Sequence, residues 1–378
     1  MLFSLALGGA EKRAVMIANY LVRYGYDVSF ILYDDKEIYQ KIDPGIKVVS
    51  LLEKYGKCNT SAFDNVKMTF IKCFYKKKAE LYDRKLFIKN TFVTNLKREL
   101  ENHNDSVIIS FMTYPNLALC MIGHINNNKI IITECNSPHY EFSESAPENI
   151  LKRLYYPNAD GICCQTDEAM SYYTFLPDAV KAVIPNPVND VGVERFTGER
   201  RKVIVHFCRF SKQKNVPLLI EAFSKLSPEY PDYELHIYGD GERRNEIEKC
   251  VEDSGCKDKI RLLPPEKNII RKVYDCAMFV SPSDREGISN SMLEAMAAGM
   301  PCICTDCPAG GPRMFIEQYE NGILIPCRDP DAMYKEMKRV IDEPELAEKM
   351  SGNIVKIRER LAPEKILNEW KEFIDSIV

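Results

Sequence analysis

The sequence predicts an α/β protein built from two doubly wound parallel sheets. Short apolar runs alternate with amphipathic stretches along most of the 378 residues. Strands that alternate with helices form parallel sheets covered on both faces. At roughly 100–200 residues per domain, this length predicts two domains. An apolar fraction of 45% is enough for two sizeable cores.

The predicted strands are short apolar runs separated by amphipathic helices. Helices are expected at 11–25, 216–226 and 290–299. Because crossovers between parallel strands are right-handed, this order favours doubly wound domains. The strands are expected at 27–33, 106–112, 129–133, 161–164, 202–207, 233–239, 259–263, 277–282 and 301–305.

The segment 184–202 interrupts this alternation. It carries two prolines, turn-forming residues and charged residues, and its apolar residues do not recur with the period of a helix or a strand. We place the domain boundary there. The last helix, predicted over 363–378, carries the single Trp, Trp370, on an apolar face suited to docking on a core.

Charge and cysteine content narrow the class of protein. A net charge of −4 does not suit a general polyanion binder. The 14 Cys have no repeating spacing, and many lie in apolar runs, where free Cys acts as a small hydrophobe. We therefore expect a reduced, cytosolic protein. Cys302, Cys304 and Cys307 lack the spacing of a zinc site, so ordinary strand and loop positions are favoured over a metal site.

Membrane insertion is not predicted. No apolar run approaches the ~20 residues of a membrane span, and the N-terminus lacks the basic region of a signal peptide. Residues 67–98, however, hold ten Lys or Arg against two acids, with six aromatic residues between them. Such a face suits an anionic membrane surface. A solvated helix pair explains the pattern equally well, and nucleic-acid binding is a weaker interpretation because the patch is local.

One candidate ligand site follows the strand 277–282. The loop SDREGIS leads to a helix that begins near Asn290. Gly287 lets the backbone approach a ligand, and Ser289 or Asn290 can cap the helix. Its N-terminus suits a phosphate or a sugar hydroxyl. Glu286 and Glu294 could hold two parts of one long ligand. The alternative interpretation is a solvated helix on which both acids are simply exposed.

Two further strand-to-helix loops carry candidate phosphate-binding groups. Arg209 and Lys214 follow the strand 202–207, at the end where open parallel sheets bind ligands. Two cations on such a loop suit a phosphate, and an exposed basic turn is the alternative. Gly8 and Gly9 precede the first helix and can admit a diphosphate, although they do not form a dinucleotide fingerprint.

Six motifs, in order along nearly the whole chain, resemble the retaining GT-B glycosyltransferases of family 4. The resemblance is strong in the C-terminal half and looser between 50 and 105. The last motif is similar to bacterial enzymes of capsule, exopolysaccharide or lipid-linked oligosaccharide synthesis. The motifs are GGAEK (8–12), IPNPV (184–188), CRFSKQKNVPLLIEAF (208–223), YGDGE (238–242), EGISNSMLEAMAAGMP (286–301) and TDCPAGGPR (305–313).

The resemblance implies a GT-B fold, in which two Rossmann-like doubly wound domains face a cleft. The acceptor-side domain would span 1–187, the nucleotide-sugar domain 188–362, and the helix 363–378 would return to the N-terminal domain. The implied activity is metal-independent, retaining transfer of a hexose or N-acetylhexosamine from a UDP-sugar to a saccharide acceptor, expected to be lipid-linked, in surface polysaccharide synthesis. No cofactor is expected. The enzyme would be cytoplasmic, with 67–98 as the candidate contact to the inner face of the membrane.

The resemblance also implies a role for each matching residue. Arg209 and Lys214 would bind the donor diphosphate, and Glu286 would contact the donor sugar; these three are the candidate catalytic residues. Glu294 would bind the ribose. Backbone N–H groups of the loop would also bind the donor, and they belong to Gly287, Ile288, Ser289 and Asn290. The N-terminal domain would complete the donor site with the wall formed by Gly8 and Gly9.

Two residues after the strand 129–133 are candidates for contacts with the acceptor or donor sugar. They are Glu134 and His139, and His139 is equally explained as a plain loop residue.

The N-terminus departs from the family pattern. Only seven residues precede Gly8, whereas the first strand is central in such a sheet. The alternative hypothesis is therefore a catalytically impaired GT-B protein that binds a nucleotide or a partner, with an incomplete N-terminal strand. An NAD-dependent dehydrogenase is disfavoured by the missing fingerprint.

Overall fold

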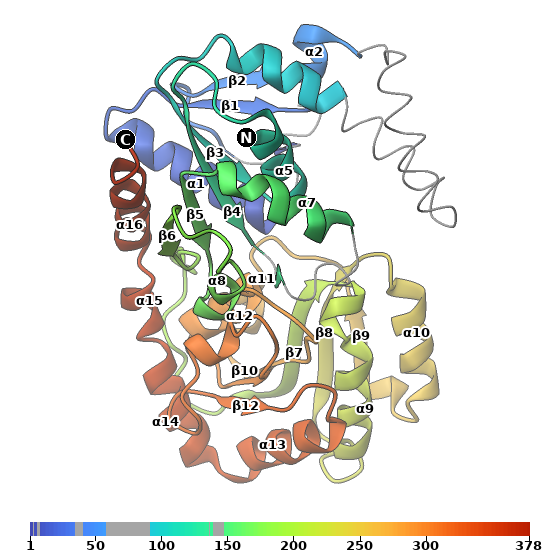
Figure 1. The fold of residues 1–378 in the computed structure, drawn as a ribbon. Coiled ribbons are helices and arrows are strands. Elements are labelled where there is room, and N and C mark those ends of the chain that lie inside the picture. Colours follow the sequence, from blue (N-terminus) through green and yellow to red (C-terminus); the bar gives the residue numbers. More distant parts are fainter. Residues whose placement is uncertain (3, 6–7, 35–40, 58–90, 136, 139–146) are drawn as a thin grey trace.

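The computed structural model describes residues 1–2, 4–5, 8–34, 41–57, 91–135, 137–138 and 147–378. Two regions of parallel sheet lie one above the other, the N-terminal region at the top of Figure 1 and the C-terminal region below. His139 and most of the basic segment 67–98 lie outside the described residues. Within the described ranges, no helix is both long enough and apolar enough to cross a membrane.

The C-terminal region is a six-stranded parallel sheet in the order β12-β11-β10-β7-β8-β9. Its central strand β10 is buried along its whole length, as expected for a parallel sheet covered on both faces. The strands are β7 (Arg201–Arg209), β8 (Glu234–Asp240), β9 (Ile260–Leu263), β10 (Cys276–Ser281), β11 (Cys302–Thr305) and β12 (Ile323–Ile325).

Helices cover both faces of this sheet. Val205 and Phe279 belong to one core cluster, together with the helix α12. Ile204 and Met278 belong to a second cluster, together with α9 and α13. Neighbouring residues of one strand thus serve opposite cores, which confirms the doubly wound prediction. The helices are α9 (Val216–Leu226), α10 (Arg244–Asp253), α11 (Ile269–Val273), α12 (Asn290–Ala297), α13 (Pro330–Asp342), α14 (Pro344–Ile354) and α15 (Ile357–Arg360).

The N-terminal region has a four-stranded parallel sheet, β3-β4-β5-β6, and a separate parallel pair, β1-β2. Its strands are β1 (Ser29–Leu32), β2 (Lys47–Ser50), β3 (Val107–Phe111), β4 (Lys129–Glu134), β5 (Gly161–Cys164) and β6 (Val180–Val183). Its helices are α1 (Gly9–Arg23), α2 (Leu51–Tyr55), a helix over 91–100, α5 (Thr113–Ile122), α7 (Pro147–Tyr155) and α8 (Asp167–Ser171).

Met1 and Leu2 occupy the position between these two N-terminal sheets. Leu2 forms an isolated parallel bridge with Leu32, and the amide of Phe111 donates to the carbonyl of Met1 at 3.3 Å. These two residues therefore lie where a central strand would join β1 to β3.

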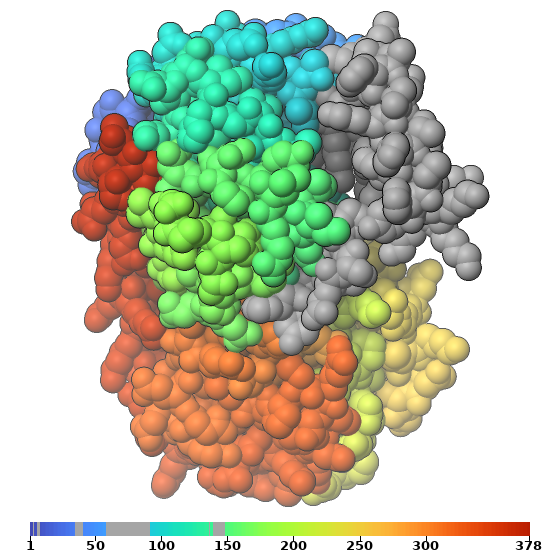
Figure 2. Space-filling view, in the orientation of Figure 1, coloured from blue at the N-terminus to red at the C-terminus, as the bar shows by residue number. Residues whose placement is uncertain are grey.

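The C-terminal helix α16 (Pro363–Asp375) returns to the N-terminal region, as predicted. Trp370 is fully buried, and its ring lies 6.4 Å from that of Phe111 on β3. The guanidinium of Arg13 lies 4.9 Å from the centre of the same Trp ring. Figure 2 shows the end of the chain, in red, running along one edge of both regions.

The chain between β6 and β7, which the structure describes throughout, has no helix or strand. Each strand expected from the sequence is present within two residues of its predicted bounds. The unpredicted strands β2, β6 and β12 lie at sheet edges. β2 and β6 are partly exposed, and β12 has only three residues, so none of these strands has a long buried apolar run.

Candidate active site between the two sheet regions

A buried ion pair lies at the carboxyl ends of β7 and β10. Lys214 ends a 3₁₀ turn after β7, and Glu286 lies in the loop after β10. The Lys214 ammonium binds Oε1 of Glu286, and the Ser283 hydroxyl donates to the same oxygen at 2.9 Å. The side chains of Lys214 and Glu286 are only 14% and 9% exposed. The two residues that sequence analysis placed on different loops are thus in direct contact.

Glu286 stabilises the charged form of Lys214. Burial acts to lower the pKa of Lys214, but the charge and hydrogen bond of Glu286 outweigh it and leave that pKa above its ordinary value. A fixed ammonium at a strand end can stabilise negative charge that develops on a bound group.

Arg209, the last residue of β7, lies at the rim of the same site. Its side chain is 77% exposed, and its guanidinium binds the carboxylate of Glu242 at 3.3 Å. Exposed pairs of this kind contribute little stability. Arg209 can therefore exchange Glu242 for a ligand phosphate at small cost.

Gly287 is a point of close approach between the two regions. A Cβ atom there would lie 2.8 Å from the carbonyl oxygen of Cys135 and 2.6 Å from Oε1 of Gln165. Any larger residue would push the regions apart. Ser289 caps α12 through its hydroxyl, which accepts from the amide of Met292 at 3.5 Å.

Three amide side chains hold this loop against the N-terminal region, and we call them the amide relay: Gln165, Asn186 and Asn290. Gln165 accepts from the backbone amide of Ile288 at 3.1 Å and donates to Asn186 at 2.8 Å. Asn186 in turn donates to the side chain of Asn290 at 2.9 Å. The N–H group of Ile288, a predicted donor-binding group, is thus bonded to Gln165 in this state.

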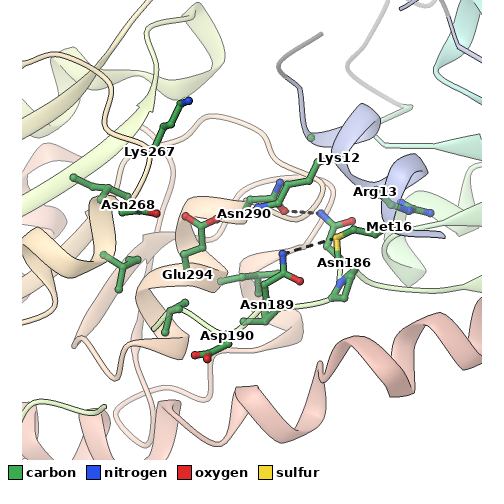
Figure 3. A pocket seen from close by; sticks show the side chains of 17 residues that line it. Lys12, Arg13, Met16, Asn186, Asn189, Asp190, Lys267, Asn268, Asn290 and Glu294 are labelled. Atoms are coloured by element: carbon green, nitrogen blue, oxygen red, sulfur yellow. Dashed lines mark hydrogen bonds and ion pairs between the residues drawn. The ribbon is translucent and has the colours of Figure 1, made fainter. Parts of the chain in front are cut away.

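A cavity of about 200 Å³ separates α1 from α12 (Figure 3). Its walls are formed by Gly9, Lys12, Arg13 and Met16 of α1, by the connecting segment 186–191, by residues 267–270, and by Asn290, Leu293 and Glu294 of α12. The ammonium of Lys12 lies 3.6 Å from Oε1 of Glu294 across the cavity.

Gly8 and Gly9 bring the N-terminus of α1 to this cleft. A Cβ atom on Gly9 would lie 3.2 Å from Nδ2 of Asn290, and one on Gly8 would clash with the Glu11 carboxylate. Burial raises the pKa of Glu11, and its own backbone hydrogen bond opposes that rise. The start of α1 thus faces the start of α12, and a side chain at Gly9 would contact the side chain of Asn290.

Glu134 lies in a different environment. At the end of β4 and 2% exposed, it pairs with Lys152 at 3.5 Å. It also accepts from the Tyr156 hydroxyl at 2.8 Å and from the Asn116 amide at 3.2 Å. This network lies inside the N-terminal region, so we do not include Glu134 in the donor site.

The cysteines behave as small apolar side chains. Cys302, Cys304 and Cys307 are buried free thiols, and burial raises the pKa of Cys307 to about 12. Among the residues that the structure describes, no group of three or more His, Cys, Asp and Glu side chains could hold a metal ion.

Sequence analysis missed Lys12, Gln165 and Asn186. A signal existed for two of them, because Lys12 and Asn186 lie within the motifs GGAEK and IPNPV. Gln165 directly follows the buried strand β5, a position at the ligand-binding edge of a parallel sheet.

Comparisons with known proteins agree with this architecture. Residues 194–356 match the family described as glycosyl transferases group 1. A glycosyltransferase of Haemophilus influenzae is 25% identical, over 96% of this chain and 95% of the relative. The N-acetylgalactosamine-N,N'-diacetylbacillosaminyl-diphospho-undecaprenol 4-alpha-N-acetylgalactosaminyltransferase of Campylobacter jejuni is 24% identical, over 91% of this chain and 90% of the relative.

Solved structures show the same fold over almost the whole chain. Sucrose-phosphate synthase from Thermosynechococcus elongatus matches with a TM-score of 0.77 at 17% identity, covering 98% of this chain and 94% of that one. HepE of Anabaena, solved in complex with UDP, matches with a TM-score of 0.74 at 15% identity, covering 99% of both chains. The protein therefore has the GT-B fold, and its residues 194–356 match the group 1 glycosyl transferases.

Proposed function

We propose that this protein transfers a hexose or N-acetylhexosamine from a UDP-sugar to a saccharide acceptor, with retention of the anomeric configuration. The observation that carries the proposal is the buried Lys214–Glu286 pair beside the exposed Arg209, at the carboxyl ends of β7 and β10. These groups combine a fixed cation, a mobile cation and a carboxylate that can accept from sugar hydroxyls.

The donor would lie along the cleft with its diphosphate near Arg209 and Lys214. Breaking the bond between the sugar C1 and the diphosphate oxygen leaves its electron pair on UDP. Preorganised cations that stabilise such developing charge are usually the largest single contribution to catalysis. The chain thus supplies this stabilisation through its own side chains.

In the route that we propose for retention, the acceptor hydroxyl attacks C1 on the face that UDP leaves. Its oxygen forms the new bond to C1, and its proton passes to the departing phosphate oxygen. We propose this front-face route because Glu286, the carboxylate nearest the proposed reaction centre, is paired with Lys214 and Ser283. A carboxylate held in this way is better suited to orient sugar hydroxyls than to attack C1, as retaining hydrolases do.

The names of two relatives support a lipid-linked acceptor. Both are Campylobacter jejuni transferases named for diphospho-undecaprenol or PP-undecaprenol saccharides. An acceptor of this class would bring the enzyme to a membrane surface. The role of residues 67–98 at such a surface remains a prediction of the sequence.

A thermal-shift screen against UDP-, GDP- and ADP-sugars tests the proposal. A ligand present at a hundred times its dissociation constant stabilises the native state by about 2.7 kcal/mol, so a UDP-sugar should raise the melting temperature. Glycosyl transfer is then measured with that donor and lipid-linked acceptors. No response to any nucleotide sugar would contradict the proposal. Binding without hydrolysis or transfer would favour the alternative of a catalytically impaired nucleotide-binding protein.

A further inference from the structure

The second acid of the motif, Glu294, has a partner on the opposite wall of the cleft. Its Oε1 lies 3.6 Å from the Lys12 ammonium, and the two side chains are 34% and 41% exposed. Figure 3 shows Lys12 on α1 and Glu294 on α12 on either side of the same cavity. Among the described residues, no hydrogen bond or ion pair involves Oε2 of Glu294.

We propose that Lys12 is a positioning residue for the donor, which holds Oε1 of Glu294 from across the cleft and leaves Oε2 for the hydroxyls of a ribose. This role depends on the proposed function, because it takes the cavity as the place of the nucleoside. A carboxylate accepts through two oxygens, so the ammonium and the ribose can share it. Donor affinity would then depend on how closely the N-terminal region approaches the other wall.

The charge balance at Glu294 explains why a cation is needed there. Burial raises the pKa of Glu294, and the nearby Lys12 lowers it, with a net rise above the ordinary value. The ionised carboxylate accepts hydrogen bonds from the ribose hydroxyls more strongly than the protonated carboxyl group does. Removing Lys12 would raise this pKa further, so the carboxylate would become protonated at a higher pH.

The other charged groups around the cavity do not replace Lys12. Arg13 is 2% exposed and lies against Trp370 in the core. Asp190 accepts from the backbone amide of Gly192 at 2.8 Å. Lys267 lines the cavity from the loop before α11. Of the ion pairs within 4.0 Å that the described residues form, only that with Lys12 involves Glu294.

Titration of UDP into the full chain between pH 5 and pH 8 tests the proposal. Lys12→Met should weaken UDP binding about fivefold at pH 7. It should also move the pH at which affinity falls upward by about half a unit or more. Lys12→Arg should retain the wild-type midpoint. Lys365→Met is the matched control, because this exposed lysine of α16 does not line the cavity, and the variant should bind UDP like the wild type.

Glu294→Gln supplies the baseline. The phosphate of UDP titrates near pH 6, and this variant keeps that titration but loses the one at position 294. An affinity and midpoint for Lys12→Met equal to the wild-type values would overturn the inference. So would a uniform loss of affinity with an unchanged midpoint, because Lys12 would then act on the donor directly. A wild-type protein that fails to bind UDP at any pH contradicts the proposed function instead.

Discussion

The candidate active site contains two lysine–glutamate pairs that differ in burial and in origin. Lys214 and Glu286 both come from the C-terminal region and are 14% and 9% exposed. Lys12 and Glu294 come from opposite regions and are 41% and 34% exposed. A buried pair is costly to break, because one uncompensated charge remains. An exposed pair contributes at most about 1 kcal/mol.

The difference assigns separate tasks to the two ends of the proposed donor site. The end that holds Lys214 and Glu286 is built from residues of one region. The end that holds Lys12 and Glu294 exists only where the two regions meet. Charge stabilisation is thus preorganised, whereas nucleoside binding can respond to the approach of the regions.

The largest effect is expected from Lys214→Ala. It removes the fixed cation, so turnover of the UDP-sugar should fall by about 10²–10³-fold. The Glu286 carboxylate is left without its partner, so stability should also fall by about 3–5 kcal/mol. Steady-state kinetics and urea unfolding measure the two effects. The matched control is Lys212→Ala, an exposed lysine of the same turn. If both variants turned over the donor equally, Lys214 would have no part in the reaction.

Lys152→Met breaks a buried pair that lies away from the proposed donor site. Lys152 is fully buried beside Glu134, so its loss should lower the free energy of unfolding by about 3–5 kcal/mol. The Michaelis constant for the donor should stay close to the wild-type value in assays well below the melting temperature. A large rise in that constant would instead place Glu134 in the donor site.

An intermediate effect is expected from Gln165→Leu in the amide relay. Asn186 then loses a partner while buried, and the amide of Ile288 loses its acceptor, which costs about 1–3 kcal/mol. We expect a donor Michaelis constant raised roughly tenfold, since 1.4 kcal/mol corresponds to tenfold. Gln165→Glu keeps the acceptor for Ile288 and should recover part of the loss. Unchanged kinetics in both variants would show that the relay does not position the loop.

The last predicted effect is a dependence of the free energy of unfolding on pH. It arises from His206, whose charge would interact with that of Lys214. Burial, with a smaller contribution from Lys214, lowers the pKa of His206 to about 3. Between pH 6.5 and pH 3 the unfolded chain therefore binds a proton that the native protein does not. Stability should fall as pH falls through this window, by up to about 1.4 kcal/mol per pH unit. His206→Phe should show a weaker dependence in urea unfolding, and an identical one would contradict this assignment.

The sequence predicted the parts of the site that lie near one another along a strand and its loop. Arg209 and Lys214 follow an apolar run, and Glu286 precedes a helix with a capping Ser, so local patterns located them. The fold class followed from the same alternation of runs. These features depend on short-range periodicity and on capping chemistry, which a single sequence contains.

Contacts between distant segments were not predictable in this way. The pairing of Lys12 with Glu294 and the relay from Gln165 to Asn290 depend on how the two regions dock. Glu134, a candidate from the sequence for a sugar contact, stands at a strand end, where ligands commonly bind. Its contacts with Lys152 and Tyr156 inside the N-terminal region were likewise not indicated by the local pattern.

The central claim, that Arg209 and Lys214 bind the diphosphate of a uridine donor, is tested most directly by calorimetric titration of UDP and uridine. Arg209→Ala is the most informative variant, because this exposed side chain can be removed without disturbing the core. The wild type should bind UDP more tightly than uridine, and Arg209→Ala should lose most of that difference while binding uridine as before. A variant that binds UDP as tightly as the wild type would contradict the account.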